Sequence, residues 1–198
     1  MVNAKGILIW EAFLPSGVRL RRATLADRAV RAVLYSEMRA RERYTAAGWS
    51  DALWEAFVAD QFRLREVHYE ATYPKADVLM IEARSGAGGR FATVGTVSVD
   101  LGTGADGAKM VRLITIELCM ASRRRGIGTH VIEALVQAAR VRGCQRMELS
   151  VARTNPDAER LYRRLGFLPS DLTSNAIVEA AGFQSMALQL GTPATSDA

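Results

Sequence analysis

The stretch Arg123-Arg124-Arg125-Gly126-Ile127-Gly128-Thr129 decides the predicted fold of this chain. It follows an apolar run, predicted as a strand over 111–120, and it opens an amphipathic pattern, predicted as a helix over 126–142. Glycine at such a turn lets the backbone come close to a ligand, and the free N–H groups of the first helical turn favour a phosphate. The stretch therefore predicts a strand-loop-helix turn that suits a phosphate-bearing ligand.

Other interpretations of the turn differ in what they require. A Walker phosphate loop ends in Gly-Lys-Ser/Thr, and because the stretch contains no lysine this interpretation fails. A dinucleotide-binding turn needs a third glycine or an alanine where Val131 stands, although Glu148 lies where the ribose-binding acid is expected, so this alternative stays open. A plain tight connection with no ligand is what Gly-x-Gly alone favours.

A second motif lies one predicted strand later and has the sequence NPDAERLYRRLGF over residues 155–167. Together the two motifs resemble the GNAT superfamily of acyl-CoA-dependent N-acetyltransferases. The family's pyrophosphate loop, Gln/Arg-x-x-Gly-x-Gly/Ala, is matched by Arg123, Gly126 and Gly128. Its next element, Asn-x-x-Ala-x-x-x-Tyr-x-x-x-Gly-Phe, is matched by Asn155, Ala158, Tyr162, Gly166 and Phe167. The two motifs have the order and separation of the family, which is more specific than either alone.

The predicted fold class is α/β of the α+β kind, a GNAT-like mixed and mostly antiparallel central sheet flanked by helices. Strands are predicted over 18–21, 78–83, 92–101, 111–120, 146–151 and 183–190, and helices over 24–43, from Ser50 towards Pro74, 126–142 and 156–165. The run Thr24 to Asp27 has the form of a capping box, and a loop over 85–89 is predicted as a hairpin. Strand, helix and strand over 111–151 predict a parallel crossover.

We expect one N-acetyltransferase domain over 17–190, an N-terminal arm over 1–16 and a disordered tail over 191–198. The arm carries the apolar run Ile7 to Leu14, which predicts that it wraps the sheet or crosses to a partner in a homodimer.

The resemblance implies acetyl-CoA as the acyl donor and assigns residues to it. Backbone N–H groups of 124–129, including Ile127 and Thr129, would surround the pyrophosphate, with charge from the side chains of Arg123, Arg124 and Arg125. The simpler interpretation of those three arginines is a solvated loop. Leu118 would pair with the pantetheine arm, and Met120 stands where the family often has proline. Asn155, next to Ala158, would contact the cofactor arm, although a helix N-cap before Pro156 explains it equally well.

The resemblance also implies the catalytic groups. The Leu118 N–H would donate to the thioester oxygen, and the Tyr162 hydroxyl would protonate the departing thiolate. Tyr162 also lies on an apolar stripe of its helix, so a core role is the alternative. The sequence does not identify a base for the amine. Glu117 beside Leu118 and Glu82 on an earlier strand are candidates, but strand alternation leaves the direction of both side chains open. The glutamate that some family members place earlier on the strand of Leu118 is missing.

Composition narrows the remaining classes. The chain has 198 residues, 49% hydrophobic, and a net charge of +5. Residues 112–164 hold eleven arginines, no lysine and five acids, which indicates a polyanionic ligand, or merely an arginine bias that decorates solvated helices. No apolar run is long enough to span a membrane, the start lacks the parts of a secretory signal, and two cysteines and two histidines have no metal-binding spacing. We therefore expect a cytoplasmic protein without a metal.

The predicted function is transfer of an acetyl group from acetyl-CoA to a primary amine of a small molecule or peptide, by direct attack in a ternary complex. One alternative is a non-catalytic acyl-CoA-binding module. A second, which rests on charge alone, is a toxin that acetylates aminoacyl-tRNA, and nucleic acid is otherwise not expected as a partner. Five residues are candidates to line an acceptor pocket, namely Trp54, Phe57, Phe62, His68 and Tyr69. The alternative is a place in the core, where aromatic residues at helical spacing are more often found.

Overall fold

The computed structural model describes residues 10–84, 86, 89–104, 106–171, 180 and 182–191. Its centre is a seven-stranded sheet in the order β1-β2-β3-β4-β5-β7-β6. All neighbouring strands pair antiparallel except β4 and β5, which are parallel. The strands are β1 Val18–Arg22, β2 Asp77–Arg84, β3 Phe91–Thr103, β4 Lys109–Leu118, β5 Arg146–Ala152, β6 Leu168–Pro169 and β7 Phe183–Gln189. The predicted fold class is confirmed.

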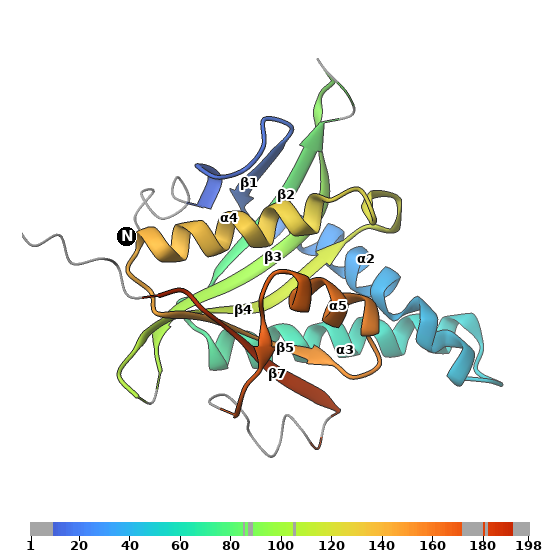
Figure 1. Cartoon of the computed structure of the whole chain (residues 1–198). Helices are drawn as coiled ribbons and strands as arrows, with labels where there is room; N and C mark the ends of the chain where they lie inside the picture. The colour runs from blue at the N-terminus through green and yellow to red at the C-terminus, as the bar shows by residue number, and fades with distance from the viewer. Residues whose placement is uncertain are drawn as a thin grey trace, which may run out of the picture.

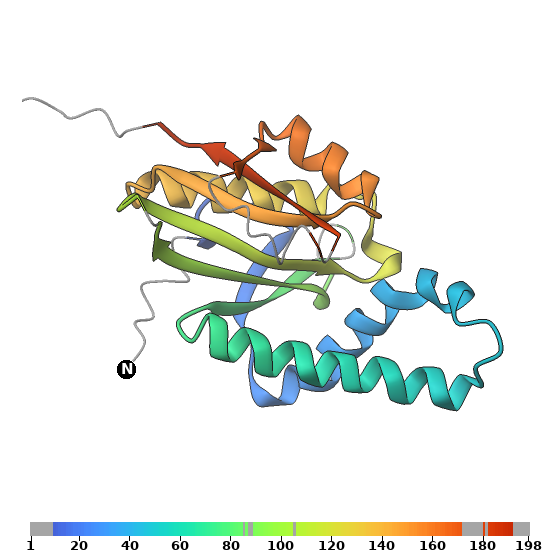
Figure 2. The same cartoon turned by 90° about the horizontal axis from the view of Figure 1, so that it is seen from below.

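Helices cover both faces of this sheet. They are α2 Arg28–Arg39, α3 Asp51–Thr72, α4 Ile127–Val141 and α5 Pro156–Arg164, with short 3-10 segments η1 Leu25–Asp27, η2 Ala40–Thr45 and η3 Met120–Ser122. Helices α4 and α5 lie on one face, and α2 and α3 lie on the other (Figures 1 and 2). Within the described residues no helix is both long and apolar enough to cross a membrane.

Side chains at the helix ends explain where the helices begin. The Ser50 hydroxyl accepts a hydrogen bond from the Leu53 N–H, which caps α3 as predicted. The capping box of Thr24 and Asp27 is present, but it starts the 3-10 segment η1, and α2 follows. The regular helix ends at Arg39, so the prediction of one helix over 24–43 is wrong in its last four residues, where the 3-10 segment η2 follows.

The main core lies between α4 and the sheet. Val131, Ile132 and Leu135 of α4 are fully buried in one apolar cluster with Met147 and Leu149 of β5. Full burial of a side chain of this size contributes about 1.5–3 kcal/mol. The α4 stripe therefore fixes the helix, and with it the turn that precedes it, against β4 and β5.

Part of the predicted N-terminal arm joins this core. Trp10 is 1% exposed and Leu14 packs against the same cluster, with the Arg142 guanidinium 4.7 Å from the centre of the Trp10 ring. The rest of the arm over 1–9, most of the predicted hairpin loop and the tail over 192–198 lie outside the described residues. The homodimer stays a prediction.

A bulge in β4 opens the sheet beside β5. Ser98 of β3 is opposite Thr115, whereas Val99 is opposite Leu113, so Ile114 is the extra residue of β4. The parallel pairing of β4 with β5 ends at Leu113 opposite Leu149. From there β4 continues to Leu118 without β5, and the two strands diverge. The predicted end of this strand at Met120 is wrong, because Met120 begins the segment η3.

Glu148 has a structural role that removes the dinucleotide alternative. Its side chain is fully buried, and its two oxygens form ion pairs with Arg112 at 2.7 Å and Arg146 at 2.6 Å. Arg146 in turn pairs with Asp106 at 2.6 Å. Each carboxylate oxygen of Glu148 is thus occupied by an arginine, so neither oxygen is free to bind a ribose.

Candidate functional site: the divergence of β4 from β5

The turn after β4 presents unpaired backbone donors. Gly126 has φ of 79° and precedes α4 as its N-cap, a left-handed conformation in which a side chain costs about 1–2 kcal/mol. The first helical bond runs from the His130 N–H to the Gly126 oxygen at 3.0 Å. The N–H groups of 127–129 precede that bond and have no acceptor within the helix. They form a positive helix end that suits a phosphate.

Gly128 leaves room beside this turn. A Cβ built on Gly128 would meet one described side chain within 4 Å, namely Leu118, whose Cδ1 lies at 3.5 Å. The backbone is therefore open to close approach by a ligand on the side that a larger side chain would fill. This opening, the helix end and the diverging strands fit a diphosphate with a long thin arm.

The three arginines of the turn do different things. The Arg123 Nε donates to the main-chain oxygen of Leu118 at 2.9 Å, so this guanidinium braces the turn against the end of β4. Arg124 has a positive φ of 59°, which is uncommon for a residue with a side chain. Arg124 and Arg125 are exposed and, among the described residues, neither forms an ion pair. The positive charge predicted to bind the phosphate is therefore available from Arg124 and Arg125, whereas the Arg123 side chain is bonded to the backbone.

The end of β4 turns its backbone towards the gap. The Cys119 N–H donates to the Val94 oxygen of β3 at 2.9 Å. Because hydrogen-bonded and non-hydrogen-bonded pairs alternate in an antiparallel ladder, the N–H and C=O of Leu118 point to the other edge, which β5 has left. Gly95 allows this close packing of β3 and β4, since a Cβ there would lie 2.3 Å from the main-chain oxygen of Glu117.

Glu117 faces the opposite side of the sheet from the α4 turn. Its side chain is 3% exposed and forms an ion pair with Arg65 of α3. Arg65 also lies over the Tyr35 ring of α2, with 4.3 Å from the guanidinium carbon to the ring centre. The second oxygen, Oε2, is buried and has no hydrogen-bond partner among the described residues.

Tyr162 of α5 is buried in the main core. Its ring is 8% exposed and meets Phe167 edge-on, with the ring centres 5.9 Å apart. Burial raises the pKa of Tyr162 to about 12. Tyr162 belongs to the main core cluster, which confirms the core interpretation. The acid role stays a prediction, and a pKa of about 12 lies further from the thiol pKa of about 8.5 than that of an ordinary tyrosine.

Comparison with known families decides the class of protein. Residues 46–167 match the sequence profile of the Acetyltransferase (GNAT) family. The chain belongs to the GNAT family. The match includes the turn of 123–129, the end of β4 and the whole of α5.

The sequence of this GNAT protein is distantly similar to that of a plant acetyltransferase. Glucosamine 6-phosphate N-acetyltransferase 1 of Oryza sativa subsp. japonica is 29% identical over 97 residues, which make up 49% of this chain and 57% of that protein. This chain thus spans little more than half the length of that relative.

Solved structures share the fold. PaiA N-acetyltransferase of Thermoplasma acidophilum, solved with coenzyme A, has a TM-score of 0.55 at 14% identity, over 87% of this chain and 98% of that one. YncA of Salmonella typhimurium, solved with acetyl-CoA, has a TM-score of 0.51 at 21% identity, over 92% and 99% of the two chains. At such identities the similarity shows a common GNAT fold.

Asn155 is the cap that the sequence predicts. Its Oδ1 accepts a hydrogen bond from the Ala158 N–H at 3.2 Å, and Pro156 takes the first helical position. Ala158 packs against the main core. A contact of Asn155 or Ala158 with a cofactor stays a prediction.

Much of the basic charge in this GNAT domain is internally balanced. Arg112 and Arg146 pair with Glu148, and Arg160 and Arg163 pair with carboxylates of their own helix. The excess of arginine therefore overstates the charge that a nucleic acid would meet, which weakens the basis for the tRNA alternative.

Two residues that contact the end of β4 and the turn after it escaped the sequence analysis. Arg65 and Glu37 lie on α3 and α2, which carry no motif, and the Glu37 Oε2 accepts a hydrogen bond from the Met120 N–H at 2.7 Å. Among the aromatic candidates, Phe62 is buried with Tyr35 in a small core of the two helices, against which Trp54 and Phe57 also pack. Tyr69 lines a cavity of about 230 Å³ between α3 and the sheet.

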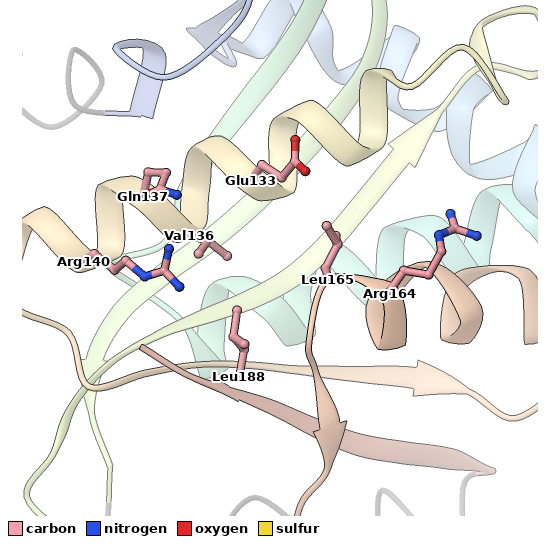
Figure 3. A pocket seen from close by; sticks show the side chains of 7 residues that line it. All are labelled: Glu133, Val136, Gln137, Arg140, Arg164, Leu165 and Leu188. Carbon is pink, nitrogen blue, oxygen red and sulfur yellow. The ribbon is translucent and has the colours of Figure 1, made fainter. Parts of the chain in front are cut away.

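A second hollow of about 270 Å³ lies apart from the predicted site. Figure 3 shows it between α4 and α5, with the side chains of Val136, Leu165 and Leu188 on its floor. The residues at its rim are Glu133, Gln137, Arg140 and Arg164. Its lining contains none of the residues predicted to bind the cofactor, so it belongs to the packing of the two helices.

Proposed function

We propose that this protein transfers the acetyl group of acetyl-CoA to a primary amine of a small molecule or peptide. The observation that carries the proposal is the divergence of β4 from β5 after Leu113, directly beside the open turn at Gly126 and Gly128. This arrangement gives a thioester a narrow gap at the end of a strand and gives its diphosphate a helix end.

The donor is held by backbone more than by side chains. The N–H groups of 127–129 and the side chains of Arg124 and Arg125 bind the diphosphate, and the Leu118 backbone binds the arm in the gap. When bound, acetyl-CoA supplies an activated acyl carbon on a good leaving group. The solved GNAT structures that contain coenzyme A and acetyl-CoA support this assignment.

Three groups of the chain serve the reaction. The Leu118 N–H donates a hydrogen bond to the thioester oxygen, where negative charge develops. Glu117 accepts a proton from the attacking amine on the face of α2 and α3, and the Tyr162 hydroxyl donates one to the sulfur. A carbon–nitrogen bond forms and a carbon–sulfur bond breaks, so one proton moves in net from nitrogen to sulfur.

Calorimetric titration with acetyl-CoA tests the donor site. The substitution Gly128→Glu places a carboxylate in the opening without a backbone clash, because Gly128 has ordinary φ and space for a Cβ. We expect the native chain to bind and Gly128→Glu to lose binding. Gly17→Glu is the matched control, since a Cβ at Gly17 meets nothing within 4 Å and the charge change is the same. Equal binding by all three proteins would overturn the placement of the donor.

A non-catalytic acyl-CoA-binding module is the second candidate, favoured by the burial of Tyr162 and its raised pKa of about 12. The two candidates differ in thiol release. Incubation with acetyl-CoA and a panel of primary amines, followed by detection of free thiol, yields product only for the enzyme. Binding without release across the panel would favour the module.

A further inference from the structure

Charged side chains on the α2 and α3 side of the sheet form a connected cluster of ion pairs. Arg31 pairs with Glu66 at 2.5 Å, Glu66 lies 3.8 Å from Arg65, and Arg65 pairs with Glu117. Two arginines and two glutamates therefore balance one another. These four side chains are between 3% and 16% exposed, so water screens the charges of the cluster only weakly.

Three buried polar atoms of this cluster have no partner among the described residues: the Nε of Arg31, the Nε of Arg65 and, as the one acceptor, the Oε2 of Glu117. Glu117 uses Oε1 for Arg65, and its Oε2 is buried without a donor among the described residues. Buried polar atoms without a partner are rare in proteins, and each one asks for a ligand or another explanation. Glu117 directly precedes Leu118, the residue whose N–H is proposed to polarise the thioester.

A second carboxylate stands at the end of β4. Glu37 of α2 accepts a hydrogen bond from the Met120 N–H at 2.7 Å and forms no ion pair within the part of the chain that the structure describes. A carboxylate has about four lone-pair sites, so Glu37 keeps capacity for another donor while it holds Met120. Glu117 thus directly precedes Leu118 in the chain, and Glu37 holds the N–H of Met120, two residues after Leu118.

We propose that the acceptor is a dication, a primary amine that carries a second ammonium group, as in a linear aliphatic diamine. This rests on the proposed function. The reacting amino group donates to the Glu117 Oε2, and the distal ammonium donates to Glu37. An ammonium offers three donors and forms charge-assisted hydrogen bonds with carboxylates, so the two sites match the two ends of one molecule.

Matched amines test the proposal. Initial rates with acetyl-CoA are measured for putrescine against n-butylamine and for cadaverine against n-pentylamine, pairs that differ in the second amino group. We expect kcat/KM to be about tenfold higher for each diamine, the effect of one charge-assisted hydrogen bond. Glu37→Gln keeps an oxygen for Met120 but removes the charge, so it raises KM for the diamines, leaves kcat within about twofold, and reduces the ratio of kcat/KM between each diamine and its matched monoamine.

Glu55→Gln is the control for charge alone, because Glu55 is an exposed residue near the start of α3. Equal kcat/KM for diamines and monoamines, or a preference for glucosamine 6-phosphate, overturns the dication while acetylation itself stands. If no amine is acetylated, the proposed function fails. Calorimetry with putrescine and coenzyme A then decides the acceptor site separately. Binding that Glu37→Gln weakens supports it, and no binding overturns it.

Discussion

Arg65 of α3 and Glu117 of β4 form an ion pair across the face of the sheet, although 52 positions separate them in the chain. The side chains are 15% and 3% exposed, so both charges are largely removed from water. This pair ties the helical layer to the strand that carries the proposed site.

Removal of one partner from this pair is expected to be costly. Arg65→Met should lower the free energy of unfolding by about 3–5 kcal/mol, because it leaves the buried Glu117 carboxylate uncompensated. The double variant Arg65→Met/Glu117→Gln should recover much of that loss. Urea unfolding measures both. Arg63→Met, which removes an exposed pair with Asp60, should cost less than about 1 kcal/mol, and a similar loss in Arg63→Met and Arg65→Met would contradict the prediction.

The two glycines of the turn should respond differently to alanine. Gly126→Ala should destabilise by about 1–2 kcal/mol, because φ at this position is 79°. Gly128→Ala should be neutral or stabilise by up to about 1 kcal/mol, since the Cβ meets Leu118 at an ordinary distance within a helix. Thermal and urea unfolding compare the two. A larger loss in Gly128→Ala would show that the turn is packed differently.

Asn155 combines two predicted roles that substitutions can separate. Asn155→Ala should cost about 1 kcal/mol through the lost cap to Ala158, whereas Asn155→Ser keeps a capping oxygen and should retain most stability. If the amide also contacts the donor, both variants lose affinity for acetyl-CoA in calorimetric titration. Full affinity in Asn155→Ser would leave the cap as its one role.

Tyr162→Phe tests the proposed acid. Burial raises the pKa of Tyr162 to about 12, so the hydroxyl stays protonated through pH 10 and kcat should show no alkaline decline from this residue below that pH. If the hydroxyl donates to the sulfur, Tyr162→Phe lowers kcat by about 10²-fold or more, with the affinity for acetyl-CoA almost unchanged. An unchanged kcat would assign Tyr162 to packing against Phe167 alone.

Asp27 makes stability depend on acid pH. Hydrogen bonds from Arg21 and from Thr24 lower the pKa of Asp27 below its usual range. A lowered pKa in the folded state contributes stability above the unfolded value of about 3.9, and this contribution is lost as pH falls below it. Asp27→Asn should therefore destabilise the protein at pH 7 and flatten the acid limb of stability against pH. Asp60→Asn, at an exposed site, should leave that limb intact.

Local features of the chain were predictable because their causes are local. The capping oxygens of Ser50 and Asn155 act on amides three residues ahead, and the glycine turn of 126–128 lies between an apolar strand and an amphipathic helix. The limits of α3, α4 and α5 follow from such signals. The two-residue strand β6 carries no signal of its own and was not predicted.

The sequence by itself determined the two motifs that carry the resemblance to the GNAT family and to its layered fold. It also determined most helices and strands and the turn that suits a diphosphate, since periodicity, caps and glycines act within a few residues. Only the tertiary structure decided that β4 separates from β5 at Ile114. It also decided that Glu148 is paired with Arg112 and Arg146, and that Glu117 faces α3. Register and side-chain direction depend on the neighbouring strands. Contacts such as Glu37 with Met120 join residues 83 positions apart, and such pairs are set by the packing of whole layers.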